Sequence, residues 1–143
     1  MGLPMGEAVV FFDRALSEDF AWRCKQAGQL ASKMGFLAAP WLGILEDESW
    51  QRHAGHANAM AQRLVMGLAS VPGASLLFPV QANGVFVMLP QSVQDGLRVR
   101  GWCFYTFIGA GGARFMCAWN TRPESVNALL ADLRELSVPA SLI

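Results

Sequence analysis

A short apolar run stands near the start of the chain. Residues 7–12 read EAVVFF, a β-branched and aromatic segment that Asp13 closes. Such a run is typical of a strand buried on both faces, which needs paired neighbours at its edges and layers over its faces. Only a short segment rich in Gly, Pro and Met precedes it. The pattern therefore predicts one strand of a sheet whose other strands lie elsewhere.

Helical patterns follow this run. Ser17 is suited to be the N-cap of a helix over residues 17–31, and Gly28 inside that helix indicates the close approach of another backbone. The segment 36–47, FLAAPWLGILED, is apolar on nearly every side, as in a helix that is buried all round or lies between subunits. Pro40 is expected to kink this helix or to mark its first turn.

The rest of the chain alternates between helix and strand patterns. A glycine-rich hairpin signal, GAGG, joins two of the expected strands. The predicted elements are, in order, a helix over 57–68, strands over 76–78 and 85–89, a helix over 92–99, strands over 104–108 and 113–119, and a helix from 121 onward. The final β-α-β-β-α order predicts a small sheet with helices on one face, which is an α+β sandwich.

Two of these helices carry a clear apolar stripe at helical spacing. Thr121 and Glu124 precede the second stripe in capping-box spacing, with Pro123 in the first turn. The stripes are Ala57, Met60, Ala61, Leu64 and Leu68 in the first helix, and Val126, Leu129, Leu130, Leu133 and Leu136 in the last. Both stripes are expected to face the core.

The composition indicates a chain that does not cover its own apolar surface. The formal net charge of the 143 residues is zero, so no basic surface is available for nucleic acid. Hydrophobic residues make up 53% of the chain and charged residues 15%, against roughly 25% charged in an average domain. The apolar excess is expected to face a partner or another part of the same polypeptide. With neither a signal peptide nor a membrane span evident, we expect a soluble cytoplasmic protein without a membrane partner.

Few residues suggest metal or acid–base chemistry. His53 and His56 share a helix face, as in some metal sites, but no third ligand is near, which favours surface or subunit-contact histidines. The acidic residues 46–48 are interpreted as a solvated turn. The cysteines are odd in number and far apart, which favours buried, reduced thiols. They are Cys24, Cys103 and Cys117.

Arg114 is the most informative polar residue. In a strand it shares a face with Met116 and Ala118, while Phe115 and Cys117 take the other face. An arginine in so apolar a setting must find an anion or reach solvent. Its guanidinium suits a carboxylate, so the residues alone leave open either a bound ligand or an ion pair within the protein.

Four long segments together resemble one enzyme family. They are RCKQAGQLASKMGFLAAPWLGILEDESW, RHAGHANAMAQRL, FPVQANGVFVMLP and GWCFYTFIGAGGARFMCAW. In this order they resemble the C-terminal portion of bacterial low-specificity L-threonine aldolases, from about Gly2 to the last helix. That family is similar to the aspartate-aminotransferase-like, fold-type-I enzymes, in which a large α/β domain carries pyridoxal phosphate and a smaller C-terminal α+β domain packs against it.

The resemblance implies that the cofactor domain is separate from this chain. Residues 1–35 would be a strand and helix from the large-domain side, and residues 36–143 the small α+β domain. The Schiff-base lysine of the family would stand just before Met1, so the chain is expected to be a truncated or split product, inactive alone. No catalytic, cofactor-binding or metal-binding residue is expected in it. Neither of its two lysines, Lys25 and Lys33, is expected to replace the missing one.

The resemblance also implies a role for Arg114. In the full enzyme, pyridoxal phosphate would serve the cleavage of threonine to glycine and acetaldehyde, and Arg114 occupies the place of an arginine that binds the substrate carboxylate. One position departs from the family, which commonly has arginine where this chain has Gly35. That arginine is expected to reach the cofactor phosphate of a neighbouring subunit, and its loss would cost about 1.5–3 kcal/mol.

Two other functions stay open at this point. The chain could be a non-enzymatic module that binds small carboxylates or dimerises, or a degenerate fragment without function. Whether the chain alone is an enzyme is left open as well. The expected partners are a second copy, a separate N-terminal cofactor domain and an amino-acid substrate.

Overall fold

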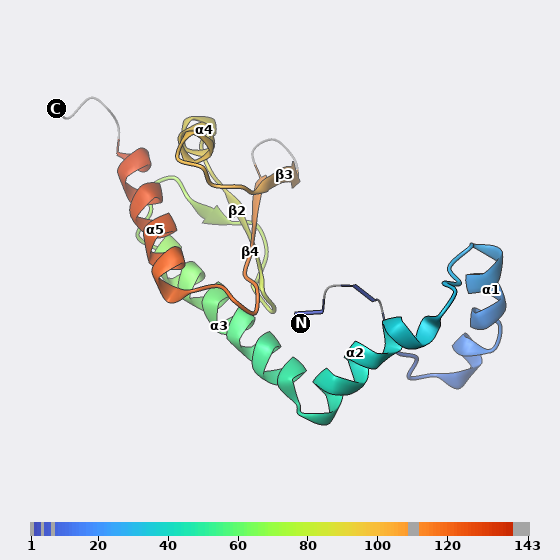
Figure 1. Ribbon diagram of the computed structural model, residues 1–143. Coiled ribbons are helices and arrows are strands. Elements are labelled where there is room, and N and C mark those ends of the chain that lie inside the picture. The colour runs from blue at the N-terminus through green and yellow to red at the C-terminus, as the bar shows by residue number, and fades with distance from the viewer. Residues whose placement is uncertain (1, 4, 7, 109–111, 139–143) are drawn as a thin grey trace. The chain divides into compact units, whose positions relative to one another are not determined.

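The computed structural model describes residues 2, 3, 5, 6, 8–108 and 112–138 (Figure 1). They form two compact units that divide between Trp50 and Gln51. Residues up to 50 are called the N-terminal unit, and residues from 51 onward the C-terminal unit. The domain boundary expected after residue 35 stays a prediction. None of the described helices is both long enough and apolar enough to cross a membrane.

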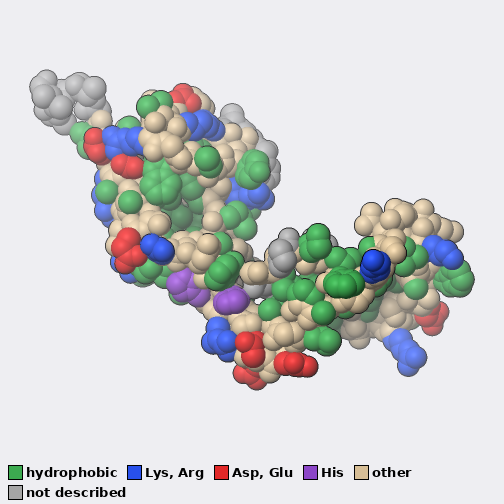
Figure 2. All heavy atoms as spheres, viewed as in Figure 1, with side chains coloured by type: hydrophobic (Ala, Val, Ile, Leu, Met, Phe, Trp, Pro, Cys, Tyr) green, Lys and Arg blue, Asp and Glu red, His purple; other side chains and the backbone are tan. Residues whose placement is uncertain are grey.

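The N-terminal unit consists of helices without an interior of their own. A 3-10 turn, η1 (Arg14–Ser17), is followed by α1 (Phe20–Gln26) and α2 (Met34–Glu46), and none of their residues is buried. The apolar helix predicted over 36–47 is confirmed as α2, with Pro40 inside it. This unit therefore presents many apolar side chains at its surface (Figure 2).

The strand predicted over residues 7–12 is wrong for the described residues of this segment. Residues 8–12 form no strand, and the side chains of Val9, Val10 and Phe12 are 60%, 70% and 99% exposed. A strand forms only where a neighbour pairs with its edge. The described part of the chain offers this segment no such neighbour, and Glu7 lies outside it.

Gly28 ends α1 and does not lie inside a longer helix. Its φ of +69° is left-handed, and the N–H of Gln29 donates to the Cys24 carbonyl at 2.8 Å. This is the arrangement of a Schellman C-cap, for which glycine is the favoured residue. Ser17 is likewise not the N-cap of α1, because its hydroxyl donates to the Arg14 carbonyl at 2.7 Å within the preceding turn.

The C-terminal unit contains the predicted sheet. Its strands β1 (Ser75–Leu76), β2 (Gly84–Met88), β3 (Tyr105–Ile108) and β4 (Gly112–Met116) are antiparallel in the order β1-β2-β4-β3. Its helices are α3 (Ser49–Leu68), which begins just before the unit, α4 (Gln91–Val99) and α5 (Pro123–Ser137). The predicted β-α-β-β-α order is confirmed as β2-α4-β3-β4-α5. Residues 109–111 of the predicted hairpin loop lie outside the described residues.

The core lies between one face of the sheet and the three helices (Figure 1). Strand side chains alternate between faces, so β2 and β4 turn alternate residues toward the helices. The buried residues are Val85, Val87, Ala113 and Phe115 of the strands, Ala57, Ala61, Leu64 and Leu68 of α3, Val93 and Leu97 of α4, and Val126, Leu129, Leu130 and Leu133 of α5. Both predicted stripes are thereby confirmed, as is the α+β sandwich. The opposite face of the sheet carries Phe86 and Arg114.

Two glycines allow α5 to approach the other helices closely. A Cβ at Gly67 of α3 would lie 2.2 Å from Cδ1 of Leu130, and a Cβ at Gly96 of α4 would lie 2.6 Å from Cδ2 of Leu136. Real Cβ atoms do not come so close to another heavy atom. The absence of a side chain at these positions therefore leaves room for the Leu130 and Leu136 side chains.

The N-cap of α5 lies one residue later than the predicted Thr121. Its N-cap is Arg122, which makes no side-chain capping bond, and Pro123 stands in the first turn as expected. The Thr121 hydroxyl instead accepts the N–H of Ala118 at 2.8 Å. The predicted capping box of Thr121 and Glu124 is wrong, because this hydroxyl is used in the turn that leaves β4.

Candidate functional site

Arg114 lies near the middle of β4, flanked by an aromatic residue on each neighbouring strand. Phe86 of β2 and Tyr105 of β3 are its register partners. Directly opposed residues project from the same face of a sheet. The Cζ atom of half-buried Arg114 lies over the Tyr105 ring, 5.2 Å from its centroid. The Phe86 ring meets Phe78 edge-on, with ring centroids 5.7 Å apart.

Two open cavities lie beside Arg114, which lines both of them. The larger, of about 580 Å³, has three aromatic residues in its lining, Trp102, Phe104 and Tyr105. The smaller, of about 380 Å³, is bounded by Phe78 and Phe86. None of the described residues that line them carries a carboxylate. A guanidinium in such surroundings is suited to bind a ligand carboxylate through two parallel N–H···O bonds.

A second arginine, Arg98, stands beside the larger cavity with its charge already balanced. Its Nη1 lies 3.3 Å from Oδ1 of Asp95, and its Nη2 donates to the Thr106 hydroxyl at 3.2 Å. Its Cζ lies over the Phe104 ring, 4.8 Å from the centroid. Asp95 supplies a counter-charge for Arg98, which we assign to the cavity wall. Arg114 lines both cavities and is the candidate for binding an anion.

A polar network fixes one wall of the cavity, and the sequence patterns did not indicate it. Trp102 donates its indole N–H to Asp132 at 2.7 Å, and Arg100 donates to Asp132 and, at 2.7 Å, to Glu135. The hydrogen bonds from Trp102 and Arg100 hold the pKa of Asp132 below its usual value, and the bond from Arg100 does the same for Glu135. These carboxylates in turn raise the pKa of Arg100. The network joins the end of α4 to α5.

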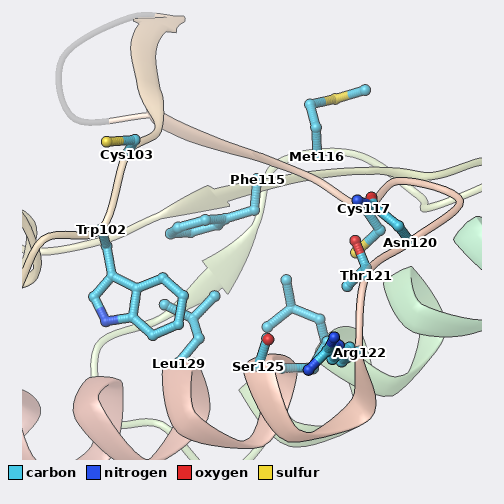
Figure 3. Close-up of a pocket in the computed structure, with 12 residues that line it drawn as sticks. Trp102, Cys103, Phe115, Met116, Cys117, Asn120, Thr121, Arg122, Ser125 and Leu129 are labelled. Carbon is cyan, nitrogen blue, oxygen red and sulfur yellow. The ribbon is translucent and has the colours of Figure 1, made fainter. Parts of the chain in front are cut away.

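A further cavity, of about 420 Å³, lies on the core side of β4 (Figure 3). In this view the Phe115 ring and Trp102 lie above α5, while Arg122 and Ser125 come from the start of that helix (Figure 3). Its walls are mostly apolar. Trp102, Cys103 and Met116 line both this cavity and the larger one beside Arg114, so the two lie next to each other.

The two histidines do not lie beside Arg114. The Nε2–H of His56 donates to the Thr121 carbonyl at 2.7 Å, and the ring of His53 lies 5.1 Å from that of Trp119. His56 therefore makes a contact within the C-terminal unit. The sequence had favoured a surface or subunit contact instead. In the described ranges, no three His, Cys, Asp or Glu side chains gather as they would around a metal ion.

The acidic residues 46–48 and two of the cysteines do not line the cavities beside Arg114. The exception is Cys103. Glu46 ends α2, and Asp47 and Glu48 form an exposed turn after it, in agreement with the predicted solvated turn. In this turn Asp47 Oδ1 accepts the N–H of Ser49 at 2.9 Å. Cys117 is buried, which raises the pKa of its thiol. Cys103 is exposed and lines the larger cavity, so the prediction of buried thiols is wrong there. Cys24 is half-buried.

Neither lysine of the chain lies in a setting suited to a Schiff base with pyridoxal phosphate. A lysine that forms a Schiff base must be activated by an enclosed or charged setting. Lys25 and Lys33 are both exposed and belong to the N-terminal unit, and the Nζ of Lys25 lies 5.8 Å from the ring centroid of Trp22. Gly35, in the first turn of α2, has no atom within 4 Å of a Cβ built on it. Among the described residues, neither lysine is therefore placed in an enclosed setting, and the space beside Gly35 is open.

The architecture has parallels among solved structures. A threonine aldolase from Leishmania major superposes with a TM-score of 0.73 over 87% of this chain and 37% of that chain, at 24% identity. An inhibitor-bound glycine decarboxylase (P-protein) gives a TM-score of 0.63 over 82% and 30%, at 24% identity. The cystine C-S lyase C-DES gives 0.50 over 57% and 24%, at 25% identity. The fold is that of the small α+β domain of fold-type-I pyridoxal-phosphate enzymes.

Sequence comparison narrows this class. No protein-family profile matches the chain. It is 60% identical over 133 residues to the low specificity L-threonine aldolase of Pseudomonas aeruginosa, and 59% identical over 133 residues to that of a second Pseudomonas strain. The chain is homologous to the C-terminal part of the low specificity L-threonine aldolases. The match covers 93% of this chain but 38% of the length of each relative.

Proposed function

We propose that this chain is the part of an L-threonine aldolase that binds the substrate carboxylate, and that it acts only together with a cofactor-bearing domain. The observation that carries the proposal is the placement of Arg114, which lines two cavities beside aromatic residues in a chain homologous to these enzymes. The proposed substrate is a 2-amino-3-hydroxy acid such as threonine.

The chemistry assigned to this chain is binding and orientation. The cleavage needs pyridoxal phosphate, which we assign to the cofactor-bearing domain, so no reaction step is assigned to the described residues. Arg114 would bind both carboxylate oxygens and thereby limit rotation of the substrate about its Cα–carboxyl axis. Orientation of this kind lowers the entropic part of a reaction barrier. Lysine, a single point charge, would bind the carboxylate without fixing its plane.

The N-terminal unit supports the need for a partner. Apolar side chains of α2 and of the segment before η1 are exposed, including Phe12 at 99%, Phe36 at 79% and Leu42 at 60%. Exposed apolar patches of this kind mark interaction sites. We assign them to a second copy of this chain or to the cofactor domain, in a cytoplasmic assembly.

A complementation experiment tests the proposal. The part of the Pseudomonas aeruginosa relative outside the 133 matched residues is co-expressed with this chain as a separate polypeptide. We expect glycine and acetaldehyde from threonine only when both are present. Arg114→Gln should raise KM for threonine about 10- to 100-fold, the effect of losing a charge-assisted hydrogen bond. Arg122→Gln, an arginine in the other cavity, is the matched control.

Two results would contradict the proposal. The first is cleavage of threonine by this chain without the second polypeptide. The second is a purified complex of both polypeptides whose KM for threonine is the same with Arg114→Gln as with the wild-type chain.

A carboxylate-binding module without enzymatic activity is a second candidate. The C-terminal unit favours it, because this unit has a buried core of its own, formed by residues of β2, β4 and the three helices. Titration calorimetry of the chain with glycine, threonine and acetate, in wild type and Arg114→Gln, distinguishes the two functions when set beside the complementation result. Binding that depends on Arg114, together with an inactive complex, would favour the module.

A further inference from the structure

Tyr105 is exposed, yet its ring is in contact with a charged side chain. Its side chain lies at the edge strand β3 and is 67% exposed, while the Arg114 guanidinium lies over its ring. The described part of the structure gives its hydroxyl no hydrogen bond, so the ring face is what Tyr105 contributes. An exposed aromatic residue at this register position has no core to fill.

We propose that Tyr105 is a positioning residue for Arg114, setting the direction in which the guanidinium meets a carboxylate. This inference rests on the proposed function of Arg114. A cation is attracted to the face of an aromatic ring, and a guanidinium placed over a ring keeps its N–H edges available for an anion. The ring thus restricts the side chain without competing for its donors.

The opposite neighbour completes the arrangement. Phe86 pairs with Arg114 from β2, and its edge-on contact with Phe78 limits its own movement. Arg114 therefore rises from the sheet between two aromatic residues, one packed against another ring and one at the open edge. Of the two, Tyr105 is the one whose ring the guanidinium lies over. It is also the one that can be changed without disturbing a second ring contact.

The chain allows a direct measurement, because Tyr105 is its only tyrosine. With ring-13C tyrosine, the chain gives one tyrosine signal set by NMR. Arg114 is followed through the arginine Nε–H signal that the Arg114→Gln variant lacks. Sodium acetate is titrated against sodium chloride at equal ionic strength. We expect acetate-specific, saturable shifts at both groups, and no shift of the tyrosine ring in Arg114→Gln.

Substitutions of Tyr105 then separate positioning from packing. Tyr105→Leu should weaken acetate binding about 2- to 5-fold, the range of an exposed cation–ring contact. Tyr105→Phe keeps the ring and should bind within twofold of wild type. Trp22→Leu, which removes another exposed ring beside a cation, Lys25, should change nothing. In the complemented enzyme the KM for threonine should follow the same order while kcat changes less.

The outcomes are distinct. If wild type shows no acetate-specific response at Arg114, the proposed carboxylate site fails, and this inference fails with it. If Arg114 binds acetate equally well in Tyr105→Leu and wild type, only the positioning role is overturned. If Tyr105→Phe binds as weakly as Tyr105→Leu, the hydroxyl and not the ring is responsible, which also contradicts the proposal.

Discussion

The indole N–H of Trp102 donates to Oδ2 of Asp132 at 2.7 Å, which ties the wall of the larger cavity to α5. Asp132 also accepts from Arg100, so one carboxylate holds two side chains that follow α4. This relationship links the stability of the C-terminal unit to the shape of the cavity beside Arg114.

Replacing Asp132 should therefore lower stability. Asp132→Asn loses charge-assisted hydrogen bonds at a side chain that is 26% exposed, so we expect a loss of about 1 kcal/mol in the free energy of unfolding. Urea denaturation measures this loss. Glu135→Gln is the matched control, because Glu135 meets the same Arg100 but is 71% exposed, and its effect should be smaller. Equal losses in both variants would contradict a special role for the Trp102–Asp132 bond.

The same network predicts how stability depends on pH. The folded-state pKa values of Asp132 and Glu135 lie below the ordinary values of 3.8 and 4.5. Groups with lowered pKa contribute stability above their unfolded pKa and lose it as the pH falls through the folded value. We expect the urea midpoint to fall below about pH 4.5. The fall should be shallower in Asp132→Asn, and an identical pH profile in that variant would count against the network.

Gly67 should not tolerate a side chain. A Cβ there meets Leu130, which is 5% exposed and has little room to move. Gly67→Ala should destabilise the chain by about 1–3 kcal/mol through overpacking. Gly55→Ala lies in the same helix with nothing within 4 Å and should stabilise it by about 0.5–1 kcal/mol. Thermal unfolding of both variants provides the comparison, and a stabilised Gly67→Ala would show that α3 and α5 can separate at little cost.

Gly35 should accept an arginine. It lies in the first turn of α2 with open space around it, and arginine is favoured over glycine in a helix by about 1 kcal/mol. Gly35→Arg should therefore raise the thermal midpoint slightly. In the complemented enzyme it should also tighten pyridoxal phosphate about 10-fold or more, if an arginine here reaches the phosphate. Unchanged cofactor affinity in an absorbance titration would show that this position does not serve the phosphate.

The sequence patterns predicted the C-terminal unit well because local period and burial agree there. The stripe that includes Leu64 and the alternation around Arg114 each select one face of an element, and the core fills between those faces. The tertiary partners of single polar groups were not predictable in the same way. Nothing in the sequence spacing indicates that Trp102 meets Asp132, or that Thr121 bonds Ala118 in place of capping α5.

In the N-terminal segment the sequence pattern did not predict the structure. The composition of residues 8–12 is that of a strand, but pairing is a property of two segments and not of one. The prediction that Gly28 lies inside a helix was wrong. Glycine is favoured both at a helix C-cap and at a close helix contact, and only the φ of Gly28 distinguishes the two. The contact between Arg114 and Tyr105 follows from register, which the positions of the predicted strands left unspecified.

The exposed rings of Phe12 and Phe36 have a consequence for how much of this chain a cell can keep. A polypeptide that shows such groups to solvent is a substrate for chaperones and proteases, which remove chains that have not found their counterpart. The abundance of this chain would then follow the supply of its counterpart and not the rate of its own synthesis.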